Sequence, residues 1–252
     1  MEGSTFDCVI DPLIDADRIA VLTGAGISTA SGIPDFRGPQ GVWTKNPAAQ
    51  AMFDIDEYVA SRAVRVEAWK HRLAVPVWTM EPNPGHLALV ELERQGRLTG
   101  LITQNVDGLH QKAGSSPELV HELHGTVRFV DCLECGRRIP MADVLRRLDA
   151  GDEDPACEVC GGILKSATVS FGQSLDRRVL DAAVAATESA DVFLAVGTSL
   201  QVYPAAGLCD IALNAGKPLL ILNAEPSPYD DEATTVLHTP IESTLPRLVI
   251  RP

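Results

Sequence analysis

Short apolar runs alternate with amphipathic segments along most of the chain. Continuous apolar runs occur at residues 18–22, 98–103, 192–196 and 219–222, and they are typical of strands buried in a parallel sheet. Segments with helical spacing are expected at residues 1–17, 42–78, 87–94, 176–189, 204–215 and 241–248. Because strands alternate with helices, the pattern predicts an α/β fold with a Rossmann-like, doubly wound parallel sheet.

Further elements complete this pattern. Residues 167–171 and 235–238 are expected to be strands that return the chain to the sheet, and the glycine turn after residue 22 leads into a helix of small residues. Within the helical segment 42–78, four large apolar side chains are expected in the core. They are Tyr58, Val59, Val66 and Trp69.

The alternation stops at residues 128–165, which are charged, contain glycine and carry cysteines around one amphipathic helix at 141–148. We therefore expect a small domain made of this module and a helical insert at 39–83. The large Rossmann-like domain would then comprise residues 1–38, 84–127 and 166–252, all within one catalytic region of residues 1–252.

Charge narrows the range of partners. The 252 residues carry a net charge of −13, so a nucleic acid is not expected as a direct partner. An acidic surface suits basic, lysine-bearing peptides, or it serves solubility. No run approaches the roughly 20 apolar residues of a membrane span, and the first residues do not read as a signal peptide. A cytoplasmic enzyme with no membrane contact is the expectation.

Two Cys-x-x-Cys pairs lie in the small module. Cys132 and Cys135 are separated from Cys157 and Cys160 by residues 136–156, a spacing typical of a four-cysteine zinc site. Four thiolates fill the tetrahedral shell of zinc, which leaves no position for an activated water. The metal is therefore expected to be structural.

The first apolar run ends in a glycine turn. Gly24 and Gly26 follow a strand and precede a helix, an arrangement in which backbone N–H groups hold a pyrophosphate. This loose fingerprint is also met in ordinary strand–turn–helix corners. The next loop, however, places Asp35, Phe36 and Arg37 side by side among glycine and proline, which is typical of a loop that covers a ligand.

Polar groups also follow other predicted strands. Residues 104–107 come directly after the strand at 98–103, where open α/β sheets bind ligands, and unpaired polar groups there would cost about 1–3 kcal/mol each. Residues 197–199 and 223–225 end two further strands and could contact phosphate or ribose. Together with the glycine turn they predict an NAD cleft.

At this point the chain closely resembles the sirtuins, the NAD-dependent protein lysine deacylases. The resemblance rests on residues 24–28 and 33–37 and extends in order to residue 248. It implies that His124, followed by Gly125, is the general base, whereas His121 is structural. It further implies that Gln104 and Asn105 approach the nicotinamide ribose and that Asp107 contacts the carboxamide.

The resemblance also implies the reaction. The acyl oxygen of a bound lysine attacks ribose C1′ as nicotinamide leaves, and free lysine and O-acyl-ADP-ribose are the products. His124 and Asn105 are the expected catalytic residues, and a peptide is expected to pair with Val169, Ser170, Phe171 and Gly172. The residues expected to bind NAD are Gly24, Ala25, Gly26, Thr29, Asp35, Phe36, Arg37, Trp43, Gln104, Asn105, Val106, Asp107, His124, Gly197, Thr198, Ser199, Asn223, Ala224, Glu225 and Ile241.

Some positions depart from the family pattern. Gln173 stands where glutamate is usual, which puts the peptide preference in question, and Ile241 follows Pro240 where a Gly-x-Ala sequence is usual beside the adenine. Residues 38–43 resemble the branch that includes the nuclear chromatin sirtuins, so protein mono-ADP-ribosylation and long-chain deacylation stay open as alternatives. A hydride-transferring dehydrogenase would not explain residues 35–37 or 104–107, and a zinc-ribbon binding module would call for a basic face.

Overall fold

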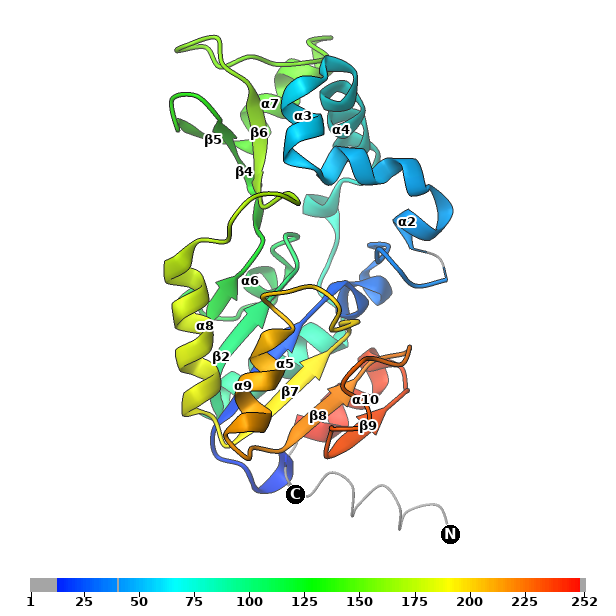
Figure 1. Cartoon of the computed structure of the whole chain (residues 1–252), viewed down its shortest axis with the longest axis vertical. Helices are drawn as coiled ribbons and strands as arrows, with labels where there is room; N and C mark the ends of the chain where they lie inside the picture. The colour runs from blue at the N-terminus through cyan, green and yellow to red at the C-terminus, as the bar shows by residue number, and fades with distance from the viewer. Residues whose placement is uncertain (1–12, 40, 250–252) are drawn as a thin grey trace.

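The computed structural model describes residues 13–39 and 41–249. These residues form a larger and a smaller β-sheet, with helices packed against them (Figure 1). The larger sheet has the order β3-β2-β1-β7-β8-β9, and every neighbouring pair is parallel. This order confirms the doubly wound sheet. Its strands are β1 (Ile19–Thr23), β2 (Leu98–Thr103), β3 (Val120–Glu122), β7 (Val192–Val196), β8 (Leu219–Leu222) and β9 (Thr235–Leu237).

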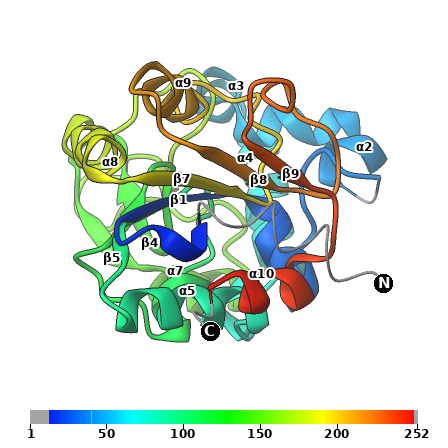
Figure 2. The same cartoon turned by 90° about the horizontal axis from the view of Figure 1, so that it is seen from below.

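Helices cover both faces of this sheet (Figure 2). On one face lie α5 (Pro84–Arg94) and α10 (Ile241–Val249), and on the other lie α8 (Arg177–Ser189) and α9 (Gly207–Asn214). Successive β1 side chains point to opposite faces, so Val21 packs in the first layer and Leu22 in the second. Burial on both faces explains why the strands are continuous apolar runs.

The smaller lobe combines helices from the insert with an antiparallel sheet. Its strands are β4 (Gly125–Cys132), β5 (Arg138–Pro140) and β6 (Leu164–Thr168), and α7 (Met141–Asp149) follows β5. Trp69 packs with Val130 and Val144 in one core. The Tyr58 hydroxyl donates to the Leu164 carbonyl at 2.9 Å, so the insert and the cysteine module form one unit.

The helical segment expected at 42–78 is helical but broken. It comprises α2 (Val42–Lys45), η2 (Pro47–Phe53), α3 (Ile55–Ala60), α4 (Arg62–Ala74) and η3 (Val77–Thr79). Asp54 and Ser61 each accept a hydrogen bond from backbone N–H groups of the next helix, so α3 and α4 begin separately. The apolar positions of α3 and α4 therefore do not follow one continuous helical repeat. Tyr58, Val66 and Trp69 are buried as predicted, but Val59 is 45% exposed, so its prediction as core is wrong.

The strand expected at 167–171 in the parallel sheet is also wrong. Residues 164–168 form β6 instead, which pairs antiparallel with β4. The polar side chains of Lys165, Ser166 and Thr168 hide this strand from a hydrophobicity pattern. The chain then leaves the sheet, and Phe171 forms a bridge with Asp54.

Smaller differences follow from local geometry. The turn after β1 enters a 3-10 helix, η1 (Ala25–Ser31), which begins where the Ile27 N–H donates to the Gly24 carbonyl at 3.2 Å. Residues 120–122 form edge strand β3, and α6 (Leu109–Ala113) follows β2; neither had been predicted. The helix predicted at 1–17 lies largely outside the described residues. No helix in the described part of the chain is long and apolar enough to cross a membrane.

Candidate active site

The carboxyl ends of the parallel strands form one edge of the larger sheet. The Gln104 N–H, after β2, donates to the Thr23 carbonyl of β1 at 3.0 Å, and the Gly24 N–H, after β1, donates to the Val196 carbonyl of β7 at 3.0 Å. The strand order reverses between β1 and β7, which is where open α/β sheets bind ligands.

A cavity of about 1430 Å³ opens at this edge, below the smaller lobe. The structure brings every predicted cofactor and peptide residue to its wall. These residues are Gly24, Ala25, Gly26, Thr29, Asp35, Phe36, Arg37, Trp43, Gln104, Asn105, Val106, Asp107, His124, Val169, Ser170, Phe171, Gly172, Gly197, Thr198, Ser199, Asn223, Ala224, Glu225 and Ile241.

His124 follows β3 and is held by the chain after β2. Its Nδ1 lies 3.0 Å from the Gln104 carbonyl oxygen. A carbonyl only accepts, so Nδ1 carries the proton and Nε2 keeps a free lone pair. Burial lowers the His124 pKa, and the Gln104 carbonyl partly opposes this shift. The side chain is therefore a neutral imidazole at pH 7 that can accept a proton at Nε2.

Asn105 has both amide hydrogens engaged. Its Nδ2 donates to the Gly24 carbonyl at 3.0 Å and to Ser28 Oγ at 3.2 Å. A new hydrogen bond to this side chain must therefore be accepted by its Oδ1. That oxygen suits a ribose hydroxyl, which can donate.

Asp107 is fixed by donors on both carboxylate oxygens. The Ser28 hydroxyl donates to Oδ2 at 2.8 Å, and the Leu109 N–H donates to Oδ1 at 2.9 Å. Burial raises the Asp107 pKa, and these donors oppose the rise. A held, half-buried carboxylate of this kind can accept the N–H of a carboxamide.

Phe36 and Trp43 form an aromatic cluster in the wall of the cavity. The rings of Phe36 and Trp43 lie 4.9 Å apart, and the Arg37 guanidinium lies 4.7 Å above the Trp43 ring. Trp43 also contacts Phe171 from the predicted peptide segment, at 5.7 Å between centroids. Cofactor loop and peptide segment therefore share one apolar surface.

The peptide segment alternates in its hydrogen bonding. The Val169 N–H donates to the His124 carbonyl at 2.8 Å, and the Phe171 N–H donates to the Phe53 carbonyl at 2.7 Å. Ser170 points its N–H the other way, where Gln173 Oε1 accepts it at 2.9 Å. The Gln173 N–H also donates to the Ser170 carbonyl at 3.0 Å, so residues 170–173 close the segment in a turn.

The far end of the cavity lies at β8 and α10. The Asn223 side chain donates to the Glu225 carbonyl at 2.6 Å, and the Asn223 carbonyl lies 2.7 Å from His238 Nδ1. Ile241 begins α10 and is 8% exposed, so its side chain is largely part of the core beside the cavity.

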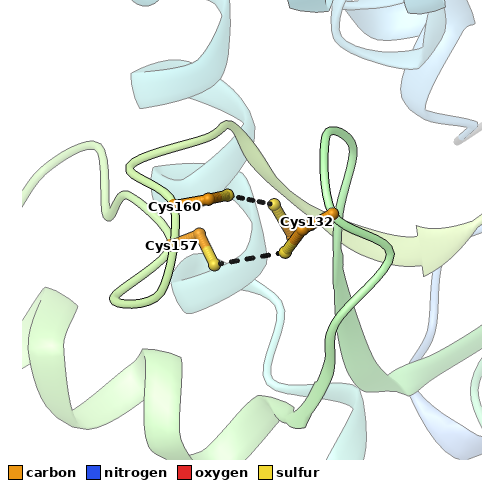
Figure 3. A group of neighbouring side chains, drawn as sticks. Cys132, Cys157 and Cys160 are labelled. Carbon is orange, nitrogen blue, oxygen red and sulfur yellow. Dashed lines mark hydrogen bonds between the residues drawn. The ribbon is translucent and has the colours of Figure 1, made fainter.

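The cysteines lie apart from this cavity, in two similar turns. Figure 3 shows Cys157 and Cys160 facing Cys132 across a small gap. The Cys132 and Cys160 sulfurs are 3.5 Å apart, those of Cys135 and Cys157 are 3.8 Å apart, and the whole group lies within 4.8 Å. Zinc–sulfur bonds of about 2.3 Å give a tetrahedral edge of about 3.8 Å. The predicted zinc site therefore fits the observed geometry.

A family model described as the Sir2 family matches residues 24–204 of the chain. The chain belongs to the Sir2 family. The match includes the glycine turn, the residues after β2, His124 and the cysteines, so the resemblance drawn from the sequence is confirmed.

Relatives extend this sirtuin assignment to more than nine-tenths of the chain. The chain is 50% identical over 231 residues to "NAD-dependent protein deacetylase 2" of Streptomyces coelicolor, covering 92% of this chain and 96% of the relative. A solved Sir2 variant with deacetylated p53 peptide and 3′-O-acetyl ADP-ribose matches with a TM-score of 0.89 at 35% identity, covering 97% of this chain and 96% of that chain. A Sir2–p53 peptide–NAD⁺ structure matches with a TM-score of 0.85 at 35% identity, covering 98% and 97%. The predicted enzyme class, an NAD-dependent protein deacetylase, is confirmed.

Sequence reasoning missed part of this sirtuin's cavity wall. His71 and Arg72 on α4 line the cavity, as does Phe53 at the end of η2. Burial lowers the pKa of both His71 and Arg72. A signal existed: Arg72 lies three residues after the buried Trp69 and therefore on the same face of the helix, where a charged residue is unusual.

Proposed function

We propose that this sirtuin removes acyl groups from lysine with His124 as the general base, Asn105 at the nicotinamide ribose and Asp107 at the carboxamide. The chain is an NAD-dependent protein deacetylase, and acyl-lysine peptides are its substrates. The proposal assigns this activity to individual residues. The observation that carries it is the Gln104 carbonyl, which leaves the His124 Nε2 lone pair free beside the cavity.

The chemistry follows from these positions. The acyl oxygen attacks ribose C1′, and the C1′–nicotinamide bond breaks. His124 accepts a proton from a ribose hydroxyl, whose oxygen bonds to the acyl carbon, and water then completes the release of lysine. Acyl group and ADP-ribose leave as O-acyl-ADP-ribose. Phe36 and Trp43 cover the site and limit the access of competing water.

The acyl-lysine peptide is placed along residues 169–172. Residues 169–172 line the cavity beside His124, and an extended peptide can bind by pairing with backbone of this kind; the Ser170 N–H itself is held by Gln173. The net charge of −13 favours lysine-rich peptides over acidic ones.

The zinc-binding cysteines have a structural role in this proposal. Zinc held by Cys132, Cys135, Cys157 and Cys160 would have no open coordination position, so it would join the two turns without touching substrate.

The large domain comprises residues 1–38, 84–127 and 166–252, and the small one residues 39–83 and 128–165. Strands β4 and β6 run across the boundaries at 127–128 and 165–166, so these two strands would connect the large domain to the small one.

We place the enzyme in the cytoplasm. The closely spaced thiols are suited to a reducing compartment, where zinc thiolates persist. Fractionation of cells that produce the protein at native levels tests this assignment.

The decisive experiment incubates purified protein with NAD and acetyl-, succinyl- or myristoyl-lysine peptides and follows products by mass spectrometry. Free lysine peptide, nicotinamide and O-acyl-ADP-ribose in equal amounts are expected. The His124→Ala variant should lose the free lysine peptide and O-acyl-ADP-ribose, because both form after the step that needs the base. The matched control is His121→Ala, because His121 lies three residues earlier and does not line the cavity.

Other results would separate the alternatives. Nicotinamide release with labelled protein but no free lysine would favour mono-ADP-ribosylation. A preference for the myristoyl peptide would favour long-chain deacylation on the same residues. Full activity of His124→Ala would overturn the assignment of the base.

A further inference from the structure

A buried histidine outside the cavity wall is connected to the nicotinamide end of the site. Ser28 Oγ lies 2.8 Å from Asp107 Oδ2, 3.2 Å from Asn105 Nδ2 and 3.4 Å from His86 Nε2. A hydroxyl has one proton and two lone pairs. The carboxylate takes the proton, so both nitrogens must donate. His86 Nε2 therefore carries a hydrogen.

The other ring nitrogen of His86 belongs to a helix start. Helix α5 begins with a capping box: Asn83 Oδ1 accepts from the Gly85 N–H at 2.9 Å, and the Asn83 N–H donates to His86 Nδ1 at 3.3 Å. An N–H only donates, so Nδ1 must be unprotonated. The cap and Ser28 thus require the same tautomer from opposite sides of the ring.

The surroundings keep this ring neutral. His86 is 0% exposed, and burial lowers its pKa to about 4. The His110 ring lies 5.0 Å away, and burial, with a smaller effect of His86, lowers its pKa to about 3. A protonated His86 would lose the acceptor that the Asn83 N–H requires.

His110 supports the same region by a separate chain. The Thr23 hydroxyl donates to Thr103 Oγ1 at 2.8 Å, so the Thr23 oxygen accepts from His110 Nε2 at 2.9 Å. Thr103 Oγ1 also accepts from the Asn105 N–H at 3.0 Å. One chain therefore ends on the Asn105 backbone, and the other ends on the Asp107 carboxylate.

We propose that His86 is a positioning residue whose two ring nitrogens have separate tasks: Nδ1 starts helix α5, and Nε2 orients Ser28 and through it Asp107 for the nicotinamide carboxamide. The inference rests on the role proposed for Asp107. The helix start fixes the tautomer, and the tautomer fixes the direction of the hydrogen bonds that reach the site.

Two substitutions separate the tasks. The His86→Asn side chain places an oxygen near Nδ1 and nothing at Nε2, so it keeps the cap and loses the donor to Ser28. The His86→Gln side chain places an amide nitrogen near Nε2 and loses the Nδ1 acceptor. The readouts are the inhibition constant of nicotinamide, the exchange of labelled nicotinamide into NAD, and the melting temperature.

The two variants should differ in opposite senses, one in nicotinamide binding and exchange and the other in melting temperature. His86→Asn should raise the nicotinamide inhibition constant at least about fivefold more than His86→Gln does, with slower exchange. His86→Gln should have the lower melting temperature, by about 2 °C or more. His121→Gln is the matched control for replacing a histidine, because His121 lies outside the cavity wall.

If either His86 variant fails to fold, Ser28→Ala tests the last link of the chain, the hydroxyl that holds Asp107, and it leaves the capping box intact. It should raise the nicotinamide inhibition constant about fivefold or more. An unchanged constant in Ser28→Ala, or equal constants in the two His86 variants, overturns the inference. If the wild-type enzyme releases no nicotinamide from NAD, the proposed function has failed instead.

Discussion

Gly26 and Gly197 lie in contact where the strand order of the larger sheet reverses. A Cβ atom at position 26 would lie 2.7 Å from Gly197 Cα, and the Gly26 N–H donates to the Gly197 carbonyl at 2.8 Å. The neighbours are backbone atoms and cannot rotate aside as a side chain could. The glycine turn after β1 therefore depends on the missing side chain at this position.

The Gly26→Ala substitution should force β1 and β7 apart at the cofactor site. We expect NAD affinity to fall at least about tenfold and the free energy of unfolding to fall by about 1–3 kcal/mol. Titration calorimetry with NAD and thermal melting measure the two effects.

Gly207→Ala is the matched control. A Cβ there would meet its nearest atoms, in the Tyr203 ring, at 3.6 Å, which is ordinary contact. Its NAD affinity should equal that of the wild type. Wild-type affinity in Gly26→Ala would show that the close approach is not needed.

The larger sheet was predictable because its strands are buried on both faces. The apolar runs at 98–103, 192–196 and 219–222 match β2, β7 and β8 at both ends. The smaller sheet was not predictable in this way. Its strand β6 carries Lys165 and Ser166, and these residues are buried by β4 and the insert, which lie far away in the sequence. A hydrophobicity pattern cannot register burial that depends on such distant contacts.

The residues of the candidate site also fall into two groups, those that the sequence pattern predicts and those whose position depends on contacts between distant segments. Residues after the strands were predictable because the carboxyl ends of parallel strands share one edge. Arg72 and His86 were missed because their environment comes from packing: Arg72 reaches the cavity from α4, and His86 reaches Ser28 through the start of α5.

The pH dependence of kcat/KM should report the His124 base. Burial lowers its pKa from the usual 6.5, and the reaction needs the neutral form. Activity is therefore present above this pKa and is lost as the pH falls through it. The acid limb of the kcat/KM profile should have its midpoint below pH 6.5. This profile is measured from initial rates with an acetyl-lysine peptide, from about pH 4.5 to about pH 9.

The control for this profile is His121→Gln. The pKa of His121 is also lowered by burial, but its side chain lies outside the cavity wall, so the limb should not move. An acid limb centred above pH 6.5, or one displaced in the control variant, contradicts the assignment to His124.

Loss of one zinc thiolate should unfold the smaller lobe. Cys157→Ser breaks a closed four-sulfur site, and we expect a loss on the order of 4 kcal/mol, which corresponds to a melting temperature about 8–16 °C lower. Zinc content by mass spectrometry should fall from one ion per chain toward zero. Activity on the peptide should fall only as far as the folded fraction falls, because Cys157→Ser removes no catalytic group.

Cys209→Ala is the control for cysteine loss. Cys209 is buried beneath the larger sheet in α9, far along the chain from the four clustered thiols. This variant should keep one zinc per chain, although its core is weakened. Full zinc content in Cys157→Ser would contradict the four-cysteine site.

Gln173 should act on the peptide and not on NAD. Its Oε1 holds the Ser170 N–H at 2.9 Å, and this fixes the segment proposed to bind the peptide. Gln173→Ala removes the acceptor, so the KM for an acetyl-lysine peptide should rise about fivefold. The KM for NAD should stay within about twofold, because the bond does not reach the nicotinamide end.

The Gln173→Glu variant separates the hydrogen bond from the charge. A carboxylate still accepts the Ser170 N–H, so the peptide KM should return close to that of the wild type. The added negative charge should also lower the KM for lysine- and arginine-rich peptides, and this gain should shrink as salt is raised, because exposed charges are screened. If the glutamate variant is as impaired as the alanine variant, the hydrogen bond to Ser170 is not what positions the peptide. If the gain persists at high salt, it does not come from the charge.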